Sequence, residues 1–349
     1  MNNGQAIRIK PITSKIFVTG AAGFIGFHLV KQLLEAGHQV IGHDGFTDYY
    51  DVDLKAERAR LLEKHEAFRM ITGRLEDYDS LRSEMLGAAP DVIIHLAAQA
   101  GVRYSLEHPR SYLESNMVGT FNVLECAREL KVGHLLIAST SSAYGANEKM
   151  PFTETDKAEW PLTFYAATKR SAELMAHTYA HLWEIPITVF RFFTVYGSWG
   201  RPDMAYYMFT KAITEGRPID VYNNGEGFRD FTHVSDLCLG IEKLMHAVPS
   251  QPDSDRSLTY PNDTLSPVAP HRVVNIGNST PVTLREFIEA IEDALGKKAQ
   301  KNLLPAQPGD VMGTWADTAL LEALTDFKPQ IRLSEGIQEF IEWYQQYYG

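Results

Sequence analysis

The segment from residue 15 to residue 37 constrains the fold of this chain more than any other. It places the apolar run KIFVT before the glycine-rich turn TGAAGFIG, and a helical pattern ending near Gly37 follows. Gly20 permits the tight turn, Gly23 lets the backbone approach a diphosphate, and Gly26 lets the helix pack on the strand. The free N–H groups at the helix start attract phosphates. The segment therefore predicts a βαβ unit that binds a dinucleotide.

The next predicted strand ends in Asp44, where a carboxylate would bind the hydroxyls of an adenosine ribose. Gly45 and Phe46 follow, and neither is an Arg or Lys that could receive a 2′-phosphate. The sequence here favours NAD over NADP. The alternative is that Asp44 is only a turn aspartate before a glycine.

Tyr165 and Lys169, in the sequence YAATK, are four residues apart and share one face of a helix. We expect the Lys169 ammonium to lower the pKa of Tyr165, because a nearby positive charge favours the phenolate. A phenolate can remove a hydroxyl proton while a hydride leaves the same carbon. Alone, this spacing could be a chance match in an amphipathic helix. Together with the glycine turn and the hydroxyl row at residues 139–142, it predicts hydride transfer to a nicotinamide.

The composition is that of a globular enzyme of 349 residues, 44% of them hydrophobic. There are 33 basic and 44 acidic residues, and the net charge of −11 gives no electrostatic case for binding nucleic acid. No apolar run has the length to cross a membrane, and the start lacks the apolar centre of a signal peptide. Cys126 and Cys238 lie far apart and are expected to be buried thiols in a reducing cytoplasm.

The order of apolar runs and helical patterns predicts an α/β fold with a doubly wound parallel Rossmann sheet of about seven strands. Continuous apolar runs are typical of strands buried on both faces. After residue 193 the pattern loosens and turn sequences become frequent, which predicts a smaller C-terminal substrate-binding lobe. The expected strands are residues 16–20, 39–44, 68–72, 91–98, 134–140, 185–192 and 273–277.

Seven motifs, in this order, resemble the extended short-chain dehydrogenase/reductases, the NAD-dependent epimerase/dehydratase family. They are TGAAGFIG, LAAQAGVR, NMVGTFNVLE, STSSAYG, YAATK, RFFTVYGSWGRPDM and RDFTHVSDL. The sixth motif and LSPVAPHRVVNIGNSTPV most resemble the UDP-glucuronate 4-epimerases, and the likeness extends from about residue 15 to the C-terminus. One departure is the sequence Gly73-Arg74-Leu75, because relatives usually have Asp at the second position, near the adenine.

The resemblance implies NAD as cofactor and assigns roles to individual residues. Thr140, Tyr165 and Lys169 would be catalytic, with Thr140 binding the sugar 4-hydroxyl and Lys169 holding the nicotinamide ribose. The implied NAD-binding residues are Gly20, Gly23, Phe24, Ile25, Gly26, Asp44, Leu96, Ala97, Ala98, Asn116, Tyr165 and Lys169. The implied substrate-binding residues are Ser141, Ser142, Thr194, Arg201, Arg229 and Asp310.

Three of these assignments have specific implied functions. Asn116 would support a bend in the active-site helix, although it could equally be a packing amide. Arg229 would bind the substrate diphosphate, and its alternative is a salt bridge with an acid such as Asp230. Asp310 would bind the uridine ribose.

The implied reaction is NAD-dependent 4-epimerisation of a UDP-sugar, from UDP-glucuronate to UDP-galacturonate, through a 4-keto intermediate. Ser141, Ser142 and Thr194 would restrain the substrate carboxylate against decarboxylation. Alternatives are a UDP-glucose/UDP-galactose-type epimerase, which usually has Asn at 194, or another UDP-uronate epimerase. A dehydratase would have Asp-Glu at 141 and 142, and a decarboxylase usually has Glu at 142. From another class, the chain could be a non-catalytic NAD-binding scaffold, but the complete catalytic set speaks against this.

The resemblance also predicts the organisation of the chain. Residues 15–194 and 230–278 would form the NAD-binding domain, residues 195–229 and 279–349 the sugar-nucleotide lobe, and residues 1–14 an N-terminal extension. Helical segments at 109–129 and 164–183 resemble the dimer-forming pair of the family, so we expect a homodimer. The alternative is that both helices only cover their own sheet. The twelve histidines show no metal-binding spacing, and no metal is expected.

Overall fold

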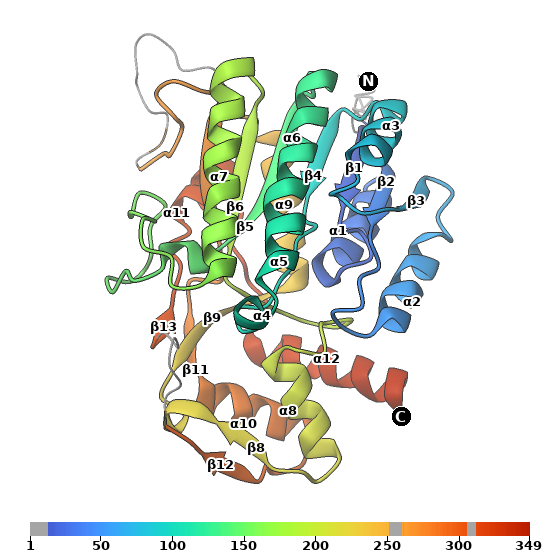
Figure 1. Ribbon diagram of the computed structural model, residues 1–349. Helices are drawn as coiled ribbons and strands as arrows, with labels where there is room; N and C mark the ends of the chain where they lie inside the picture. The colour runs from blue at the N-terminus through green and yellow to red at the C-terminus, as the bar shows by residue number, and fades with distance from the viewer. Residues whose placement is uncertain (1–12, 251–259, 261, 306–311) are drawn as a thin grey trace, which may run out of the picture.

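The computed structural model describes residues 13–250, 260, 262–305 and 312–349. Its centre is a parallel sheet of seven strands in the order β10-β6-β5-β4-β1-β2-β3 (Figure 1). The order reverses between β1 and β4, which is the switch point where ligands bind in open α/β sheets. The strands are β1 (Lys15–Thr19), β2 (Gln39–Asp44), β3 (Phe68–Thr72), β4 (Val92–His95), β5 (His134–Thr140), β6 (Ile187–Phe192) and β10 (His271–Ile276).

Helices cover both faces of this sheet, because alternate residues of each strand point to opposite sides. In β1, Ile16 and Val18 pack into one apolar cluster and Phe17 into the other. The first cluster includes α1 (Phe24–Glu35), α2 (Val52–Leu62), α9 (Val234–His246) and α11 (Ala319–Thr325). The second includes α3 (Tyr78–Ala88), α6 (Gly119–Leu130) and α7 (Phe164–Trp183), which lie in front of the sheet in Figure 1.

A separate apolar cluster forms the core of the half at the lower end of Figure 1. It joins α8 (Ala205–Thr214), α10 (Leu284–Leu295) and α12 (Leu333–Tyr348) around short strands. Strand β9 (Phe228–His233) pairs with β7 (Thr194–Tyr196), β11 (Pro281–Thr283) and β13 (Gly313–Thr314), and β8 (Ile219–Val221) pairs with β12 (Lys301–Leu303). The remaining elements are α4 (Tyr104–Glu107), α5 (Pro109–Tyr112), the π-helix η1 (Leu113–Val118) and the 3-10 helices η2 (Ser141–Tyr144) and η3 (Tyr222–Gly225).

The predicted fold class is confirmed, and all seven expected strands form the central sheet. Two differences have local causes. The run at 91–98 forms a strand only to His95. The chain then leaves the sheet, and the N–H groups of Leu96 and Ala97 bond to Thr19 at the end of β1. The helix expected at 109–129 is divided into α5, the π-helix η1 and α6, because residues 113–118 adopt the wider π-helical turn.

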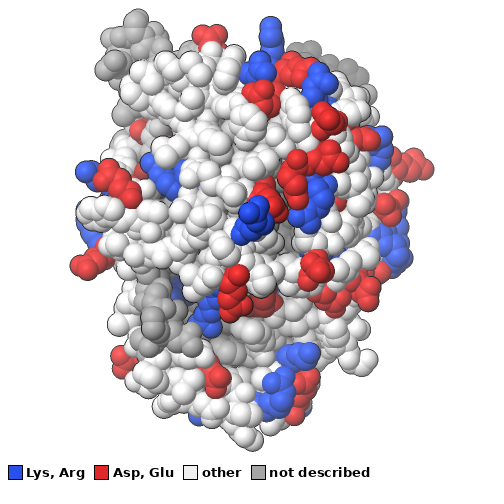
Figure 2. Space-filling model, viewed as in Figure 1, with Lys and Arg blue, Asp and Glu red and all other residues white. Residues whose placement is uncertain are grey.

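Neither cysteine forms a disulfide, and Cys126 and Cys238 are both buried, as predicted. Within the described ranges, no helix has the length and apolarity needed to cross a bilayer. The same part of the chain holds no group of three His, Cys, Asp or Glu residues placed to bind a metal ion. Acidic and basic side chains are interspersed over the face that Figure 2 shows, with few over the upper part of α7.

Candidate functional site

The glycine turn between β1 and α1 has no room for side chains. A Cβ atom on Gly26 would lie 2.0 Å from the Gly20 carbonyl oxygen, and one on Gly23 would lie 3.0 Å from the same atom. Gly20 has a φ of +75°. Helix α1 begins at Phe24 and Ile25 with no side-chain cap, so its first N–H groups are left for a ligand. This bare backbone cradle fits a dinucleotide diphosphate.

Asp44, at the end of β2, is held in place by backbone N–H groups. Its carboxylate accepts a hydrogen bond from Ala22 at 3.0 Å and another from Phe46 at 2.9 Å. The Arg74 side chain packs closely against the residue after Asp44, since a Cβ on Gly45 would lie 3.0 Å from the Arg74 Cδ. Arg74 forms a 2.7 Å ion pair with Glu76. No Arg or Lys adjoins Asp44 along the sequence, as stated above, but the fold brings the Arg74 side chain close to Gly45.

The segment after β4 and the π-helix meet through Asn116. The Gln99 N–H donates to the Asn116 side-chain oxygen at 2.7 Å, and the Asn116 amide donates to the Gln99 carbonyl and the Thr168 hydroxyl. Asn116 is buried and lies in η1, where one extra residue widens the helical turn. Leu96, Ala97 and Ala98 form the start of this segment, and the N–H of Ala97 donates to the Thr19 hydroxyl at 3.2 Å.

Thr140, Tyr165 and Lys169 come together at the carboxyl end of β5. Thr163 caps α7 by accepting a hydrogen bond from the Ala166 N–H, which places Tyr165 in the first turn and Lys169 one turn later. The Thr140 hydroxyl lies close enough to the Tyr165 phenol to act on its pKa. Burial lowers the pKa of Lys169 to about 8, although the Glu173 carboxylate acts to raise it. Lys169 thus keeps its proton at neutral pH.

The pKa of Tyr165 moves in the direction opposite to our prediction. Burial raises it, while the neighbouring Thr140 hydroxyl and the positive charge of Arg201 act to lower it. The expected lowering by Lys169 is wrong, because the removal of water around the buried phenol outweighs the effect of nearby charge. The cation that acts on this phenol comes from the other half of the molecule.

Glu173 is a buried residue behind this site that the sequence analysis missed. It accepts hydrogen bonds from the Ser139 hydroxyl and from Arg191, whose Nε and Nη2 atoms lie 3.0 and 2.7 Å from its oxygens. Burial acts to raise the pKa of Glu173, but the Arg191 guanidinium holds it below its usual range. The signal was available, because Glu173 follows Lys169 by one helical turn.

The predicted substrate-binding hydroxyls lie at the same edge of the sheet. Thr140 pairs with Phe192 across β5 and β6, so Ser141, Ser142 and Thr194 all leave the sheet close to its carboxyl end. The Ser142 N–H donates to the Thr140 hydroxyl oxygen at 3.1 Å, which fixes the start of η2.

Arg201 faces this region with its charge already paired. Its Nε and Nη2 atoms both donate to Asp203, and the Tyr49 hydroxyl donates to Asp203 at 2.9 Å. The Arg201 guanidinium also lies 5.7 Å from the centre of the Tyr49 ring. A carboxylate ligand would therefore meet an arginine whose orientation is fixed.

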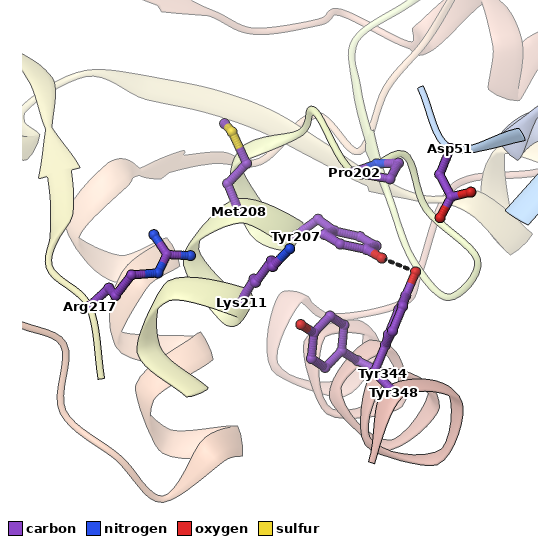
Figure 3. A pocket seen from close by; sticks show the side chains of 8 residues that line it. All are labelled: Asp51, Pro202, Tyr207, Met208, Lys211, Arg217, Tyr344 and Tyr348. Atoms are coloured by element: carbon purple, nitrogen blue, oxygen red, sulfur yellow. Dashed lines mark hydrogen bonds between the residues drawn. The ribbon is translucent and has the colours of Figure 1, made fainter. Parts of the chain in front are cut away.

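Arg229 lies on β9, where its Nη1 atom donates to the Phe228 carbonyl at 2.7 Å and the Met312 carbonyl at 3.3 Å. Asp310 lies outside the described residues. A pocket of about 440 Å³ opens between α8, α12 and the start of α2 (Figure 3). It contains none of the predicted site residues; Asp51, Pro202, Tyr207, Met208, Lys211, Arg217, Tyr344 and Tyr348 line it.

The arrangement can hold a dinucleotide over β1 and β4 and place a Thr–Tyr–Lys set beside its far end. A phenol beside a second hydroxyl can take the proton of an alcohol O–H while a hydride leaves the carbon that bears it. Behind Lys169, the buried Glu173 carboxylate pairs with Arg191 and also acts to raise the pKa of Lys169. This combination suits reversible oxidation of a hydroxyl group.

Comparison with known proteins agrees with this chemistry. A relative from Rhizobium meliloti (strain 1021), "Probable UDP-glucuronate 4-epimerase", is 53% identical over 334 residues, which cover 96% of this chain and 98% of the relative. The solved structure of UDP-glucuronic acid 4-epimerase from Bacillus cereus with UDP-glucuronic acid and NAD has a TM-score of 0.83 and 33% identity, covering 96% of this chain and all of the other.

Fold similarity extends to an epimerase of a neutral sugar. The UDP-glucose 4-epimerase of Thermotoga maritima with UDP-glucose has a TM-score of 0.82 at 26% identity, with 96% of this chain and 100% of the other covered. Fold similarity therefore does not distinguish epimerases of uronates from epimerases of neutral sugars, whereas the higher sequence identity favours the uronate branch. The profile of the NAD dependent epimerase/dehydratase family matches residues 16–257, and this chain belongs to that family.

Proposed function

We propose that this protein is a UDP-glucuronate 4-epimerase that uses NAD to interconvert UDP-glucuronate and UDP-galacturonate. The observation that carries the proposal is the proximity of the Thr140 hydroxyl to the Tyr165 phenol, with buried Lys169 one turn along the same helix. The glycine cradle supplies the place for NAD, whose nicotinamide accepts and returns a hydride when bound. The sequence identity to uronate epimerases favours this substrate.

In the proposed mechanism, Tyr165 acts as a phenolate, the form that the Arg201 charge favours against burial. It takes the proton of the sugar 4-hydroxyl while Thr140 holds the oxygen by a hydrogen bond. Lys169, protonated below about pH 8, orients the ribose beside the phenol. The sugar becomes a 4-keto sugar, turns about its link to the diphosphate, and receives the hydride on its other face. Tyr165 then returns the proton, so no net oxidation takes place.

The nucleotide must stay bound while the sugar turns, so strong contacts belong at the UDP end. Arg229 is the proposed ligand of the diphosphate, since a guanidinium matches phosphate oxygens in geometry and charge. Asp310 is the proposed ligand of the uridine ribose. In this proposal, residues 15–194 and 230–278 bind NAD, and residues 195–229 and 279–349 bind the sugar nucleotide.

A 4-keto glucuronate can lose carbon dioxide, because its carboxylate lies β to the ketone. We assign Ser141, Ser142 and Thr194 to hold the carboxylate, so that its bond to carbon 5 overlaps poorly with the carbonyl. Arg201 provides a fixed positive charge near the same place. Hydroxyls at these positions fit neither the acidic pair of a dehydratase nor the glutamate of a decarboxylase.

Incubation with UDP-glucuronate, followed by proton NMR of the anomeric signals, tests this function directly. We expect UDP-galacturonate to form without added NAD when the purified protein retains its cofactor, with the Tyr165→Phe variant as the inactive control. Parallel samples with UDP-glucose distinguish a neutral-sugar epimerase. Conversion of UDP-glucose but not UDP-glucuronate would overturn the substrate assignment, and no conversion of either would favour the scaffold alternative.

A homodimer is the proposed assembly, with α6 and α7 forming the contact. Exposed apolar side chains gather there: Phe121 on α6 is 45% exposed, and Leu174 and Leu182 on α7 are 55% and 58% exposed. Figure 2 shows few charges over the upper part of α7. A surface of this kind is typical of an interface.

The compartment we propose is the reducing cytoplasm, since both cysteines are free and buried.

Light scattering after size-exclusion chromatography tests the assembly. We expect a dimer mass for the wild type and a monomer for Leu174→Glu combined with Leu182→Glu. Leu303→Glu is the matched control, because Leu303 is 61% exposed but lies on β12 in the other half. A monomeric wild type would overturn the proposal.

A further inference from the structure

Arg58, on α2, is a fully buried arginine with 0% exposure. Within the described part of the chain, no Asp or Glu forms an ion pair with it, and its Nε atom has no hydrogen-bond partner. Burying a cation without a counter-charge is unfavourable. The free-energy penalty is on the order of several kcal/mol even after the surrounding protein relaxes. Such a residue needs a compensating role.

The guanidinium of Arg58 joins two segments that are far apart in sequence. Its Nη1 atom donates to the carbonyl of Ala22, in the glycine turn, at 3.1 Å and to the Tyr50 hydroxyl at 2.8 Å. Its Nη2 atom donates to the carbonyls of Trp199 and Gly200 at 2.5 and 3.2 Å. One side chain thus fastens the cofactor turn to the loop after β7.

We call residues 198–200 the strap. The carbonyls of Trp199 and Gly200 accept from Arg58, and the remaining strap carbonyl, that of Ser198, lies 2.8 Å from His28 Nε2 on α1. Burial lowers the pKa of His28 to about 3, so the ring is neutral and its Nε2–H donates. Three consecutive carbonyls of the strap therefore accept hydrogen bonds from the helices on the cofactor side.

The strap leads directly into Arg201, whose charge reaches Tyr165 and whose guanidinium is oriented by Asp203. A shift of the strap would move the backbone of Arg201 with it, since no residue intervenes. The position of Arg201 beside the reaction site thus depends on contacts made to α1 and α2.

We propose that Arg58 is a positioning residue that couples the cofactor turn to the strap and to Arg201. The diphosphate of NAD would approach the backbone around Gly23, next to Ala22, where the unpaired charge of Arg58 favours an anion. Ordering of the turn by NAD then orders the strap through the shared guanidinium. The inference rests on NAD binding, and it does not depend on which sugar nucleotide the enzyme accepts.

Hydrogen–deuterium exchange and NAD titration test this coupling on cofactor-stripped protein. In the wild type, NAD should slow amide exchange in the peptide that contains residues 198–204. In Arg58→Met we expect this slowing to disappear and the Kd for NAD to rise at least tenfold. Arg60→Met is the matched control: Arg60 lies on the same helix, is exposed, and pairs with Glu57. It should behave as the wild type.

Arg58→Lys separates charge from geometry. Its single nitrogen keeps the positive charge but cannot reach both the turn and the strap in the way a planar fork does. We expect its NAD affinity to fall less than that of Arg58→Met, while exchange in the strap stays fast with NAD bound. This variant also serves if Arg58→Met does not fold.

Two outcomes would overturn the proposal. The first is that Arg58→Lys retains the wild-type slowing of the strap by NAD. The second is that exchange rises equally in all peptides, since a purely structural role would loosen the whole fold. Neither readout requires catalysis, so failure here is distinct from failure of the proposed epimerase activity.

Discussion

The six strands from β1 to β6 and the short strands of the other half obtain their order in different ways. Each strand of the first group has four to seven residues and reads in the sequence as an apolar run. Strands β7, β8, β11, β12 and β13 have two or three residues each and depend on partners distant in the sequence. Local pattern therefore determines the cofactor half, whereas tertiary contacts determine the substrate half.

One buried carboxylate illustrates the second kind of order. Asp230, on β9, accepts hydrogen bonds from the N–H groups of Asn278, Ser279 and Ala316 at 2.7 to 3.1 Å. These donors lie in segments that follow β10 and β13. A single side chain thus fixes the meeting of three parts of the chain, which no local pattern could indicate.

The largest effect we predict lies in the cofactor half, where function should be separable from fold. Tyr165→Phe removes only the phenol oxygen, so turnover should fall by about a hundredfold to ten-thousandfold. NAD and UDP affinities, measured by calorimetry, should remain near wild type. More than half of the wild-type turnover in this variant would remove Tyr165 from the mechanism.

Among the short strands that pair with β9, by contrast, one polar residue should carry stability. Asp230→Ala leaves three backbone N–H groups without their acceptor, so the free energy of unfolding should fall by about 3 kcal/mol, at roughly 1 kcal/mol or more each. Urea denaturation measures this loss. Asp220→Ala, at an exposed position on β8, is the control and should change stability little.

The same carboxylate predicts a pH dependence. Burial raises the pKa of Asp230 to about 6, while the N–H groups of Ala316, Asn278 and Ser279 act to lower it. A raised pKa means that the folded protein binds this proton more tightly than the unfolded chain. The stabilisation linked to this proton is therefore lost as pH rises through about 6, while the hydrogen bonds to the carboxylate remain. A stability profile of Asp230→Ala that kept the wild-type slope between pH 4 and 6 would contradict this.

A smaller effect is expected where the cofactor half recognises its ligand. Asp44→Ala should weaken NAD by roughly tenfold to a hundredfold, as one or two hydrogen bonds to a charged group are worth about 1.5–3 kcal/mol. Discrimination against NADP should relax, because the carboxylate no longer repels a 2′-phosphate. Titrations of cofactor-stripped protein measure both, and unchanged affinities for NAD and NADP would refute the assignment.

The smallest predicted effect concerns the junction between the halves. Thr194→Ala, at the start of β7, should remove one hydrogen bond to the substrate carboxylate. We expect a minor share of turnovers, roughly a few per cent, to release carbon dioxide and form UDP-pentose or 4-keto-pentose products, which mass spectrometry detects. Epimerisation at the wild-type rate with no carbon dioxide would place the restraint on other residues.

The contrast between the halves also explains what the sequence could predict. The glycine turn, the seven long strands and the Tyr165–Lys169 pair are local patterns, and the structure places each as expected. The family and the cofactor are confirmed by the comparisons. The individual roles of the site residues remain predictions.

Contacts across long sequence distances could not be predicted in this way. Arg74 lies against Gly45 only because β2 and β3 are neighbours, and Arg58 contacts the strap only because the two halves meet. The predicted direction of the shift in the Tyr165 pKa was wrong for a related reason. Spacing along a helix indicates a nearby charge but does not indicate how much water is excluded from the phenol.

The place of β10 at the edge of the central sheet has a consequence for the order of events during synthesis. Strand β10 pairs with β6, yet all of the chain between Phe192 and His271 must leave the ribosome before they can meet. Nascent domains fold from the N-terminus as they emerge. Six strands can therefore assemble early while β6 presents an open edge, and the last strand closes it only after the substrate half has begun to appear.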